Sequence, residues 1–308
     1  MATSGSTAFN MPFTDIAEEA WERAGRELRS GYDLQTARRS MNLMTIEWQN
    51  RGINMWTIEQ GVLDLVQGQA TYALPDDTID LLEQSVRTGA HNSVTQSDLN
   101  LNRISISTYA SIPNKITQSR PIQVVIHRDS GQTYPTGITL GATATNTATT
   151  ITLSGVAGLP PAGFVKIENE IINYGYIEGN VLQNCFRGQQ GTTAATHTVG
   201  GTAIPVYWEQ VPAVTVWPVP DNVESYQIVY WRMRRVQDAG SGIETADMNF
   251  RFFPCLVAGL AYHIAMKVPE FMDRVPMLKA AYEEQFELAA GEDREKAPVR
   301  FVPRAGRF

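Results

Sequence analysis

Few of the residues that could catalyse a reaction or bind a metal ion stand at the spacings that such sites require. The chain has four histidines, and they form neither an HExxH nor an H-x-H pattern: His91, His127, His197 and His263. Because a zinc site needs several ligands at set spacings, this scatter predicts no metal centre. His263 lies among apolar residues of a helical pattern, which predicts a core histidine whose hydrogen bonds are satisfied inside the protein.

Motifs for nucleophilic catalysis and for phosphate binding are also missing from the sequence. It contains no G-x-S-x-G elbow and no G-x-x-x-x-G-K-[ST] loop. The closest to a glycine-rich loop is RGQQGTTAATHTVGG at 187–201, which has no lysine and no strand-loop-helix context. We therefore predict a loop between strands there, and we expect no cofactor.

The adjacent carboxylates Glu18-Glu19 and Glu283-Glu284 could serve the acid and base steps of glycoside hydrolysis. Both pairs fall on the exposed faces of helical patterns, where acidic side chains are ordinarily solvated. We predict that they are surface residues and that the chain is not an enzyme.

A different chemistry gathers at the C-terminal end, VRFVPRAGRF at 299–308. From Arg294 onward five side chains are positive and one is negative, a local balance of 5 − 1 = +4. These residues fit no helix or strand period, so one interpretation is a solvated, disordered end. The other is an arm that docks on a partner, with arginines as hydrogen-bond donors and phenylalanines as anchors: Arg300, Phe301, Arg304, Arg307 and Phe308.

The overall composition narrows the class of protein. The 308 residues suffice for about two domains, and 25 basic against 32 acidic side chains give a net charge of −7. This balance argues against a general nucleic-acid coat. Cys185 and Cys255 stand in no CxxC pattern, which predicts a reduced, cytoplasmic setting. The most apolar window, 252–266, is too short for a membrane span, and residues 1–13 lack a secretory signal.

Helical periods occur near both ends of the chain. Asp15 is predicted to cap a first helix that ends at Ser30-Gly31, and Asp33 to cap a second that ends at Gly52. Helical periodicity returns at Asp247 or Asn249, and a last helix starts near Pro276. We expect these helices to pack into one bundle, with the first two antiparallel and with two tryptophans in the core, Trp21 and Trp48.

Alternating periods between the helices predict strands at 55–75, 105–112, 122–127, 213–220 and 226–235, and therefore an α+β fold. Residues 137–205 are rich in threonine and poor in charge, with a Gly179-Asn180 hairpin signal, which predicts a small inserted β module. The predicted division is a flexible leader at 1–13, a helical bundle of 14–55 and 245–292, a β domain of 56–136 and 206–244, the inserted module at 137–205, and an arm at 293–308.

An ordered run of motifs resembles the head-to-tail adaptor family of tailed bacteriophages, which includes tail tubular protein A and the packaged-DNA stabilisation protein. The resemblance covers about residues 14–135 and 206–292. The insertion departs from the family and looks like a β module of several phage tail and baseplate proteins. The matching residues are Ala20, Arg23, Leu34-x-x-Ala37, Trp48, Arg51-Gly52-x-Asn54-x-Trp56, Gly68-x-x-x-Tyr72-x-Leu74-Pro75 and the stretch 217–234.

The resemblance implies a structural protein of the virion, made in the host cytoplasm and placed at the head-tail junction. It implies a ring of twelve copies that assembles under the portal protein after DNA packaging, retains the DNA and carries the downstream tail protein. The arm at 293–308 would then bind the portal. An acidic chain suits a channel through which double-stranded DNA passes without sequence readout, and no membrane contact is expected.

Two other classes of function stay open at this point. A virion-associated cell-wall hydrolase would need two carboxylates facing each other across a cleft, roughly 5 to 10 Å apart. A glycan- or receptor-binding tail protein is the other, and its sequence basis is the threonine-rich insertion at 137–205.

Overall fold

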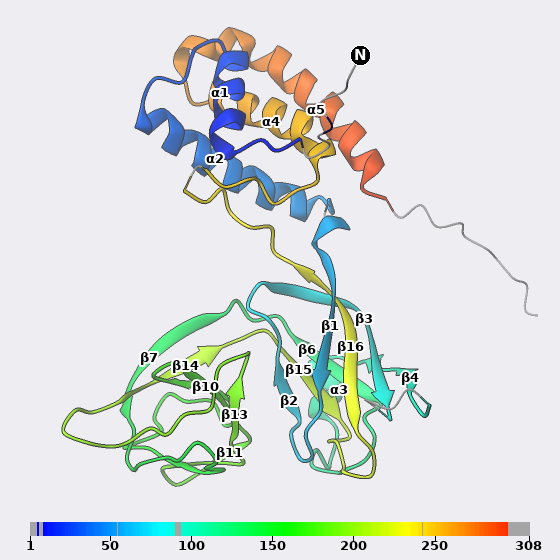
Figure 1. Ribbon diagram of the computed structural model, residues 1–308, viewed down its shortest axis with the longest axis vertical. Coiled ribbons are helices and arrows are strands. Elements are labelled where there is room, and N and C mark those ends of the chain that lie inside the picture. The colour runs from blue at the N-terminus through cyan, green and yellow to red at the C-terminus, as the bar shows by residue number, and fades with distance from the viewer. Residues whose placement is uncertain (1–4, 6–8, 54, 90–93, 242, 295–308) are drawn as a thin grey trace, which may run out of the picture. The chain divides into compact units, whose positions relative to one another are not determined.

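The computed structural model describes residue 5 and residues 9–53, 55–89, 94–241 and 243–294. The chain forms two compact units. The helical unit combines both ends of the chain, Met1–Thr57 and Val236–Phe308, and the β unit is the continuous stretch Ile58–Arg235 (Figure 1). The α+β class predicted from the sequence is confirmed, with helices near both termini and a β region between them. The boundaries between the helical unit and the β unit lie after residues 57 and 235, whereas the sequence analysis placed them after residues 55 and 244.

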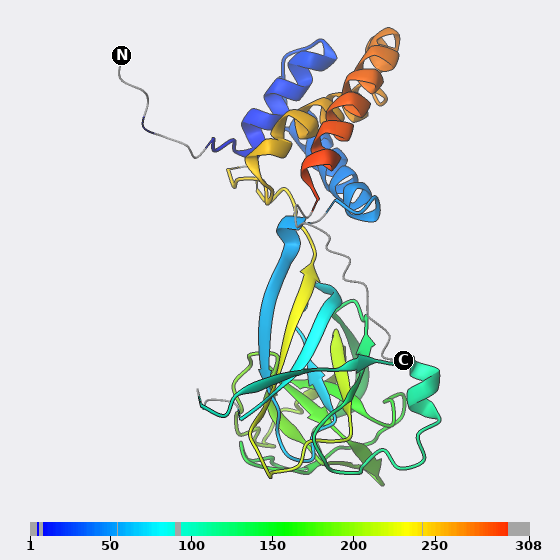
Figure 2. The ribbon, with the colours of Figure 1, turned by 90° about the vertical axis from the view of Figure 1, so that its right-hand side faces the viewer.

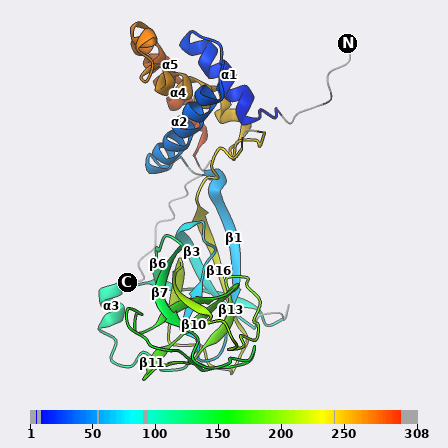
Figure 3. The same cartoon turned by 90° about the vertical axis from the view of Figure 1, so that its left-hand side faces the viewer.

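Four α-helices make up most of the described helical unit (Figure 1, Figure 3). Three 3₁₀ turns accompany them: η1 Met55–Thr57, η2 Phe250–Phe252 and η3 Pro269–Arg274. Pro254 lies in the first turn of its helix, where its missing N–H has no helical partner to lose, as predicted. The helices are α1 Phe13–Ala24, α2 Gly31–Asn50, α4 Phe253–Ala265 and α5 Val275–Glu292.

Helix α4 lies at the centre of this unit and contacts α1, α2 and α5. Nearly all of its residues are buried. Gly259 allows a close approach, because an added Cβ would lie 2.5 Å from Met44 Sδ and 2.7 Å from a ring carbon of Tyr282. Trp48, which is 1% exposed, donates a hydrogen bond from Nε1 to the Tyr282 hydroxyl at 2.8 Å. The predicted burial of Trp48 and Trp21 is confirmed.

The caps of the first two helices differ from the prediction. Helix α1 begins at Phe13, before Asp15, and its N-cap Pro12 has no side-chain hydrogen bond. The Phe13 N–H donates instead to the Glu244 carbonyl oxygen at 3.1 Å, so a distant chain segment satisfies the helix start. The helix ends at Gly25, whose φ is +123°, well before Ser30-Gly31.

Helix α2 starts at Ser30, whose hydroxyl accepts a hydrogen bond from the Asp33 N–H at 3.2 Å. Asp33 is therefore in the first turn and is not the cap; its carboxylate accepts from Arg26 Nη2 at 2.8 Å. The predicted role of Gly52 is confirmed, since its φ is +86° directly after the helix.

The β domain, 58–131 and 211–235, packs two four-stranded sheets on each other. Their orders are β1-β16-β3-β4 and β2-β15-β6-β5, and β1 pairs antiparallel with β16 (Figure 2). Leu81 and Ile228 of one sheet meet Val124 and Val214 of the other in the core between them. The strands are β1 Ile58–Asp64, β2 Thr71–Ala73, β3 Thr78–Thr88, β4 Ser97–Asn100, β5 Asn102–Arg103, β6 Gln123–His127, β15 Ala213–Trp217 and β16 Tyr226–Arg234.

The strand predicted at 105–112 is wrong, because Ile106–Ala110 forms the short helix α3. Ser105 caps it by accepting a hydrogen bond from the Thr108 N–H at 3.1 Å. Hydroxyl side chains that bond to nearby backbone groups compete with strand pairing. The Ser105 cap therefore favours a helix here although the apolar residues alternate as in a strand.

The β module has a core of its own, which includes Ile151, Val165 and Leu182. The Gly179-Asn180 turn is confirmed, since it joins two strands that pair Glu178 with Val181. The module's sheets are β13-β10-β9-β14-β7 and β11-β12-β8. Their strands are β7 Gln132–Thr139, β8 Ile151–Thr152, β9 Gly163–Ile167, β10 Glu170–Tyr174, β11 Tyr176–Glu178, β12 Val181–Gln183, β13 Phe186–Gln189 and β14 Pro205–Gln210.

The module is inserted between two paired strands of the β domain. His127 at the end of β6 lies opposite Ala213 at the start of β15, a pairing that a short hairpin turn could close. Strands β7 and β14 begin and end outside 137–205, so the module's sheet extends from Gln132 to Gln210. A small apolar cluster containing Phe164 and Ala73 joins the module to the β domain.

Replacing Trp48 tests whether helices from the two ends of the chain share one core. Trp48→Ala empties a buried aromatic site and removes the hydrogen bond to Tyr282, so we expect it to lower the free energy of unfolding by about 3–5 kcal/mol. Lys279→Ala, on an exposed site of α5, should change it by less than about 0.5 kcal/mol. Urea and thermal denaturation followed by circular dichroism measure both, and an unchanged Trp48→Ala transition would contradict this packing.

Candidate functional site

The five residues predicted to bind a portal lie outside the described part of the chain: Arg300, Phe301, Arg304, Arg307 and Phe308. The leader at 1–13 is described only at residue 5 and from residue 9 onward. The arm therefore stays a prediction from the sequence.

The paired carboxylates lie on the surface of the helical unit. Glu19 forms an ion pair with Arg23 at 2.8 Å, and Glu283 lies 3.9 Å from Arg51 Nη1. Within 9–53, 55–89, 94–241 and 243–294, no group of three or more His, Cys, Asp or Glu side chains could hold a metal ion. No helix among the same residues is long and apolar enough to cross a membrane.

The two cysteines and His263 offer no reactive group. Both thiols are free and buried, and burial raises the pKa of Cys185 and of Cys255 to about 12, which disfavours the reactive thiolate. The prediction that His263 is satisfied is wrong, because its Nε2 has no hydrogen-bond partner among the described residues and the Glu47 carboxylate is 3.9 Å away. Burial lowers the pKa of His263 and favours its neutral form.

A buried ionic cluster in the β module was missed by the sequence analysis. Glu170, which is 1% exposed, accepts hydrogen bonds from Arg187 Nη2 at 2.6 Å and Nε at 2.7 Å. The N–H groups of Gly188 and Ala195 donate to it at 3.0 Å, and His197 Nε2 lies 2.9 Å away. The ring's other nitrogen, Nδ1, is 2.7 Å from Glu168.

This cluster fastens the glycine-rich segment to the module. Glu170 lies on β10, whereas its partners Arg187 to His197 span β13 and the loop that follows it. The loop predicted at 187–201 is confirmed from residue 190 onward, whereas 187–189 belongs to β13. Both carboxylate oxygens of the buried Glu170 accept hydrogen bonds from within the module, so the cluster is a structural fastening. The amino-acid composition was the one sequence signal that could have pointed to this cluster. Three of the five charged side chains that the sequence analysis counted in the module belong to it. The five are Lys166, Glu168, Glu170, Glu178 and Arg187.

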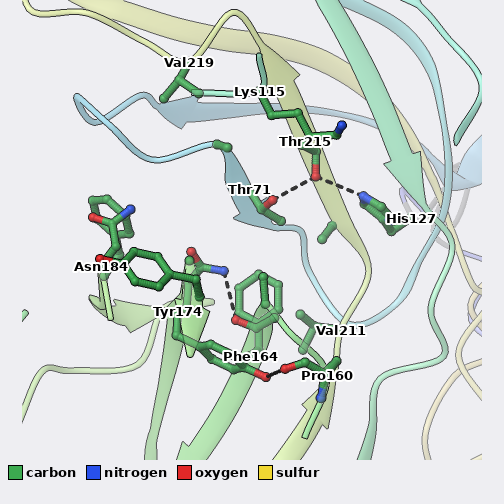
Figure 4. Close-up of a pocket in the computed structure, with 18 of the residues that line it drawn as sticks. Thr71, Lys115, His127, Pro160, Phe164, Tyr174, Asn184, Val211, Thr215 and Val219 are labelled. Carbon is green, nitrogen blue, oxygen red and sulfur yellow. Dashed lines mark hydrogen bonds between the residues drawn. The ribbon is translucent and has the colours of Figure 1, made fainter. Parts of the chain in front are cut away.

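A pocket of about 740 Å³ lies between the β domain and the β module, inside the β unit (Figure 4). Its β-domain wall carries a hydroxyl pair, because Thr215 Oγ1 is 2.8 Å from Thr71 Oγ1 and 2.9 Å from His127 Nε2. Burial lowers the pKa of His127, an effect that Asp129 partly opposes, so the neutral imidazole is favoured. The two hydroxyls and this imidazole are therefore neutral hydrogen-bonding groups on that wall.

The module supplies the opposite wall of this pocket (Figure 4). Phe164 is buried there, and the Tyr174 hydroxyl donates to the Pro160 carbonyl oxygen at 2.7 Å. The pocket also touches Glu209, which is 7% exposed and accepts from Thr133 through Oε1 at 2.9 Å. Its Oε2 has no hydrogen-bond partner in the described part of the chain. Neither Thr215 nor Glu209 stands in a sequence motif, so no signal pointed to this pocket.

Two helices of the helical unit carry apolar side chains on their outer faces. The α2 stripe consists of the positions on that face that recur every three or four residues: Tyr32, Gln35, Arg39, Leu43, Ile46 and Asn50. The α5 stripe follows the same spacing: Met277, Ala281, Glu284, Leu288 and Gly291. Leu43 is 66% exposed and Leu288 is 61% exposed, although each helix already buries its opposite face in the core. The large apolar members are Tyr32, Leu43 and Ile46 in the α2 stripe and Met277 and Leu288 in the α5 stripe. Exposed apolar side chains that gather on one face are a feature of protein contact surfaces.

No protein-family model matches the chain, and no curated protein is significantly similar to it in sequence.

The buried cluster should make the β unit sensitive to acid. Burial alone raises the pKa of Glu170, but the hydrogen bonds from Arg187, the Ala195 and Gly188 N–H groups and His197 outweigh it and lower the pKa from 4.5 to about 2. The folded state therefore holds the ionised form, and its stabilisation is complete above pH 4.5 and is lost as the pH falls toward 2.

We expect Glu170→Gln to remove this dependence and to cost about 3–5 kcal/mol at pH 7, because it leaves the buried Arg187 without its counter-charge. Glu178→Gln, at an exposed carboxylate of the same module, should leave both quantities unchanged. Urea unfolding at pH 7, 5, 4 and 3 measures them. Equal pH slopes for the wild type and Glu170→Gln would contradict the role assigned to the cluster.

Proposed function

We propose that the chain is a structural head-to-tail adaptor of a tailed bacteriophage, which forms a ring under the portal protein. The observation that carries the proposal is the helical unit, in which helices from both ends of the chain share one core while α2 and α5 keep exposed apolar stripes. A monomer gains nothing from such stripes, whereas a subunit that contacts its neighbours buries them.

The residues that carry the resemblance have structural roles, which supports the proposal at the level of the fold. Trp56 donates from Nε1 to the Asp247 carbonyl oxygen at 2.9 Å, so it joins the two chain segments of the helical unit. The Tyr72 hydroxyl bonds to the Val66 N–H at 2.9 Å and to its carbonyl oxygen at 3.1 Å. This closes a loop around Gly68, whose φ is +79°.

The two stripes are different surfaces, so a contact between the α2 stripe of one copy and the α5 stripe of the next is heterologous. A heterologous contact generates a closed ring when its rotation closes. Their charges are complementary, since the α2 stripe contains the exposed Arg39 and the α5 stripe contains the exposed Glu284. In the proposed ring these two residues face each other across the subunit contact.

The remaining partners follow from the same proposal. The arm at 293–308 contacts the portal protein through its arginines and phenylalanines, and the tail protein attaches on the other side of the ring. Twelve copies surround a channel for double-stranded DNA, for which the net charge of −7 disfavours retention. The protein acts in the virion, at the head-tail junction, after its synthesis in the host cytoplasm. Catalysis has no part in this function.

Exchanging the charges of Arg39 and Glu284 tests whether the two stripes meet in a ring. We expect Arg39→Glu to weaken assembly about tenfold or more, because it places two negative groups in contact, and Arg39→Glu combined with Glu284→Arg to restore it. Lys279→Glu, an exposed charge on α5 outside the stripe, is the matched control and should assemble normally. Mass photometry and analytical ultracentrifugation measure particle size for the protein alone and mixed with the portal protein of the same genome.

The proposal predicts one closed ring species, with or without the portal as a trigger. Monomers under both conditions would contradict the adaptor function. A ring that forms equally well with Arg39→Glu would instead retain the function and contradict the assignment of these two stripes to the subunit contact.

A further inference from the structure

We infer that the pocket between the β domain and the β module binds a neutral saccharide. This inference concerns the β unit alone and does not depend on the proposed ring.

The size of the pocket suits a short oligosaccharide. Its volume of about 740 Å³ falls within the roughly 300–1,000 Å³ of sites that hold small ligands. Residues from both parts of the β unit line it, so a ligand there would be held between Thr71 on one side and Phe164 on the other (Figure 4). The cavity lies where the module is inserted, beside the end of β6 and the start of β15.

The charges in the lining disfavour a phosphorylated ligand. Lys115 is the one lysine or arginine among the lining residues, and its ammonium already donates to the carbonyl oxygens of Ala110 at 3.1 Å and Ile112 at 2.9 Å. Asp129 and Glu209 add two carboxylates, and the neutral form of His127 is favoured. With one ammonium against two carboxylates in the lining, an anion would meet net negative charge.

The aromatic content of the lining suits a ring with an apolar face. Aromatic side chains offer large rigid surfaces, and tyrosine and tryptophan combine such a surface with a polar tip. The C–H face of a pyranose can pack on such rings while its hydroxyl groups point to the polar wall. Six aromatic residues line the pocket: Tyr109, Phe164, Tyr174, Tyr176, Phe186 and Trp208.

Hydrogen-bonding groups for the hydroxyls of a sugar are present on both walls. The hydroxyls of Thr71 and Thr215 act as donor or acceptor, and the exposed Asn184 adds a side-chain amide. Glu209, whose Oε2 is buried without a partner in the described chain, also belongs to the lining and adds a carboxylate close to the module's wall. A neutral polyol can bond to these hydroxyls and to the amide, whereas a purely apolar ligand would leave them unused.

Saturation-transfer difference NMR and isothermal titration calorimetry on the full chain test this inference, with tri-N-acetylchitotriose, maltotriose and lactose as the saccharide probes and AMP as the anionic probe. We expect at least one saccharide to bind and AMP not to bind. Thr215→Val removes the hydroxyl that joins Thr71 to His127 and should weaken binding at least tenfold. Thr152→Val makes the same change at an exposed site outside the pocket and should leave the affinity unchanged.

Tyr176→Ala is a second variant that guards against misfolding, because Tyr176 is 52% exposed and its truncation removes little buried surface. It should also weaken saccharide binding while leaving the thermal transition in place. The inference is overturned if none of the three saccharides binds at 10 mM, if AMP binds in their place, or if the folded Thr215→Val and Tyr176→Ala proteins bind as tightly as the wild type.

Discussion

The apolar surface of α4 is the constraint on which the helical unit depends. This helix is buried on almost every side, so it requires partners all round it, and they come from both ends of the chain: α1 and α2 from the first 50 residues and α5 from beyond residue 274. The contact of Trp48 with Tyr282 closes this arrangement, and Gly259 of α4 provides the space that it needs. Because the two ends are held together, the chain between them leaves and re-enters the helical unit, and 58–235 folds as a unit of its own.

In the β unit, the corresponding constraint is that the β module is inserted between β6 and β15 while these two strands stay paired. The module interrupts the chain between His127 and Ala213, which remain opposite each other in register. The domain therefore keeps its two-sheet core while the module builds a separate core around Val165 and Leu182. The pocket follows from this arrangement, because two independently formed cores meet along a small apolar cluster and leave space beside it.

The sequence predicted the features that depend on local patterns. The helical periods, the burial of Trp21 and Trp48, the turn at Gly179-Asn180 and the positive φ of Gly52 could all be read from neighbouring residues. Features decided by distant partners were missed or misplaced. The start of α1 depends on Glu244, more than 200 residues away, and Glu170 finds its partners on the later strand β13 and in the loop after it.

The pocket was also missed by the sequence analysis, because its residues come from distant parts of the chain. The hydroxyl pair of the pocket joins Thr71 to Thr215 across 144 positions of the chain, and neither residue belongs to a motif. Among the residues that carry the resemblance, Gly68 and Tyr72 are the opposite case, since they fix the local backbone of one loop and stand close together in the sequence, whereas Trp56 bonds to the distant Asp247. They support the fold directly and the proposed adaptor function through it.

The most direct test of that function is the position of this chain in an intact virus particle, measured by cryo-electron microscopy of the tailed phage that encodes it. The account predicts a single ring of this protein directly beneath the portal, with the helical unit of each copy contacting its neighbours. Density for the chain elsewhere in the particle, such as at the tips of tail fibres, or a complete particle that lacks it, would contradict the account.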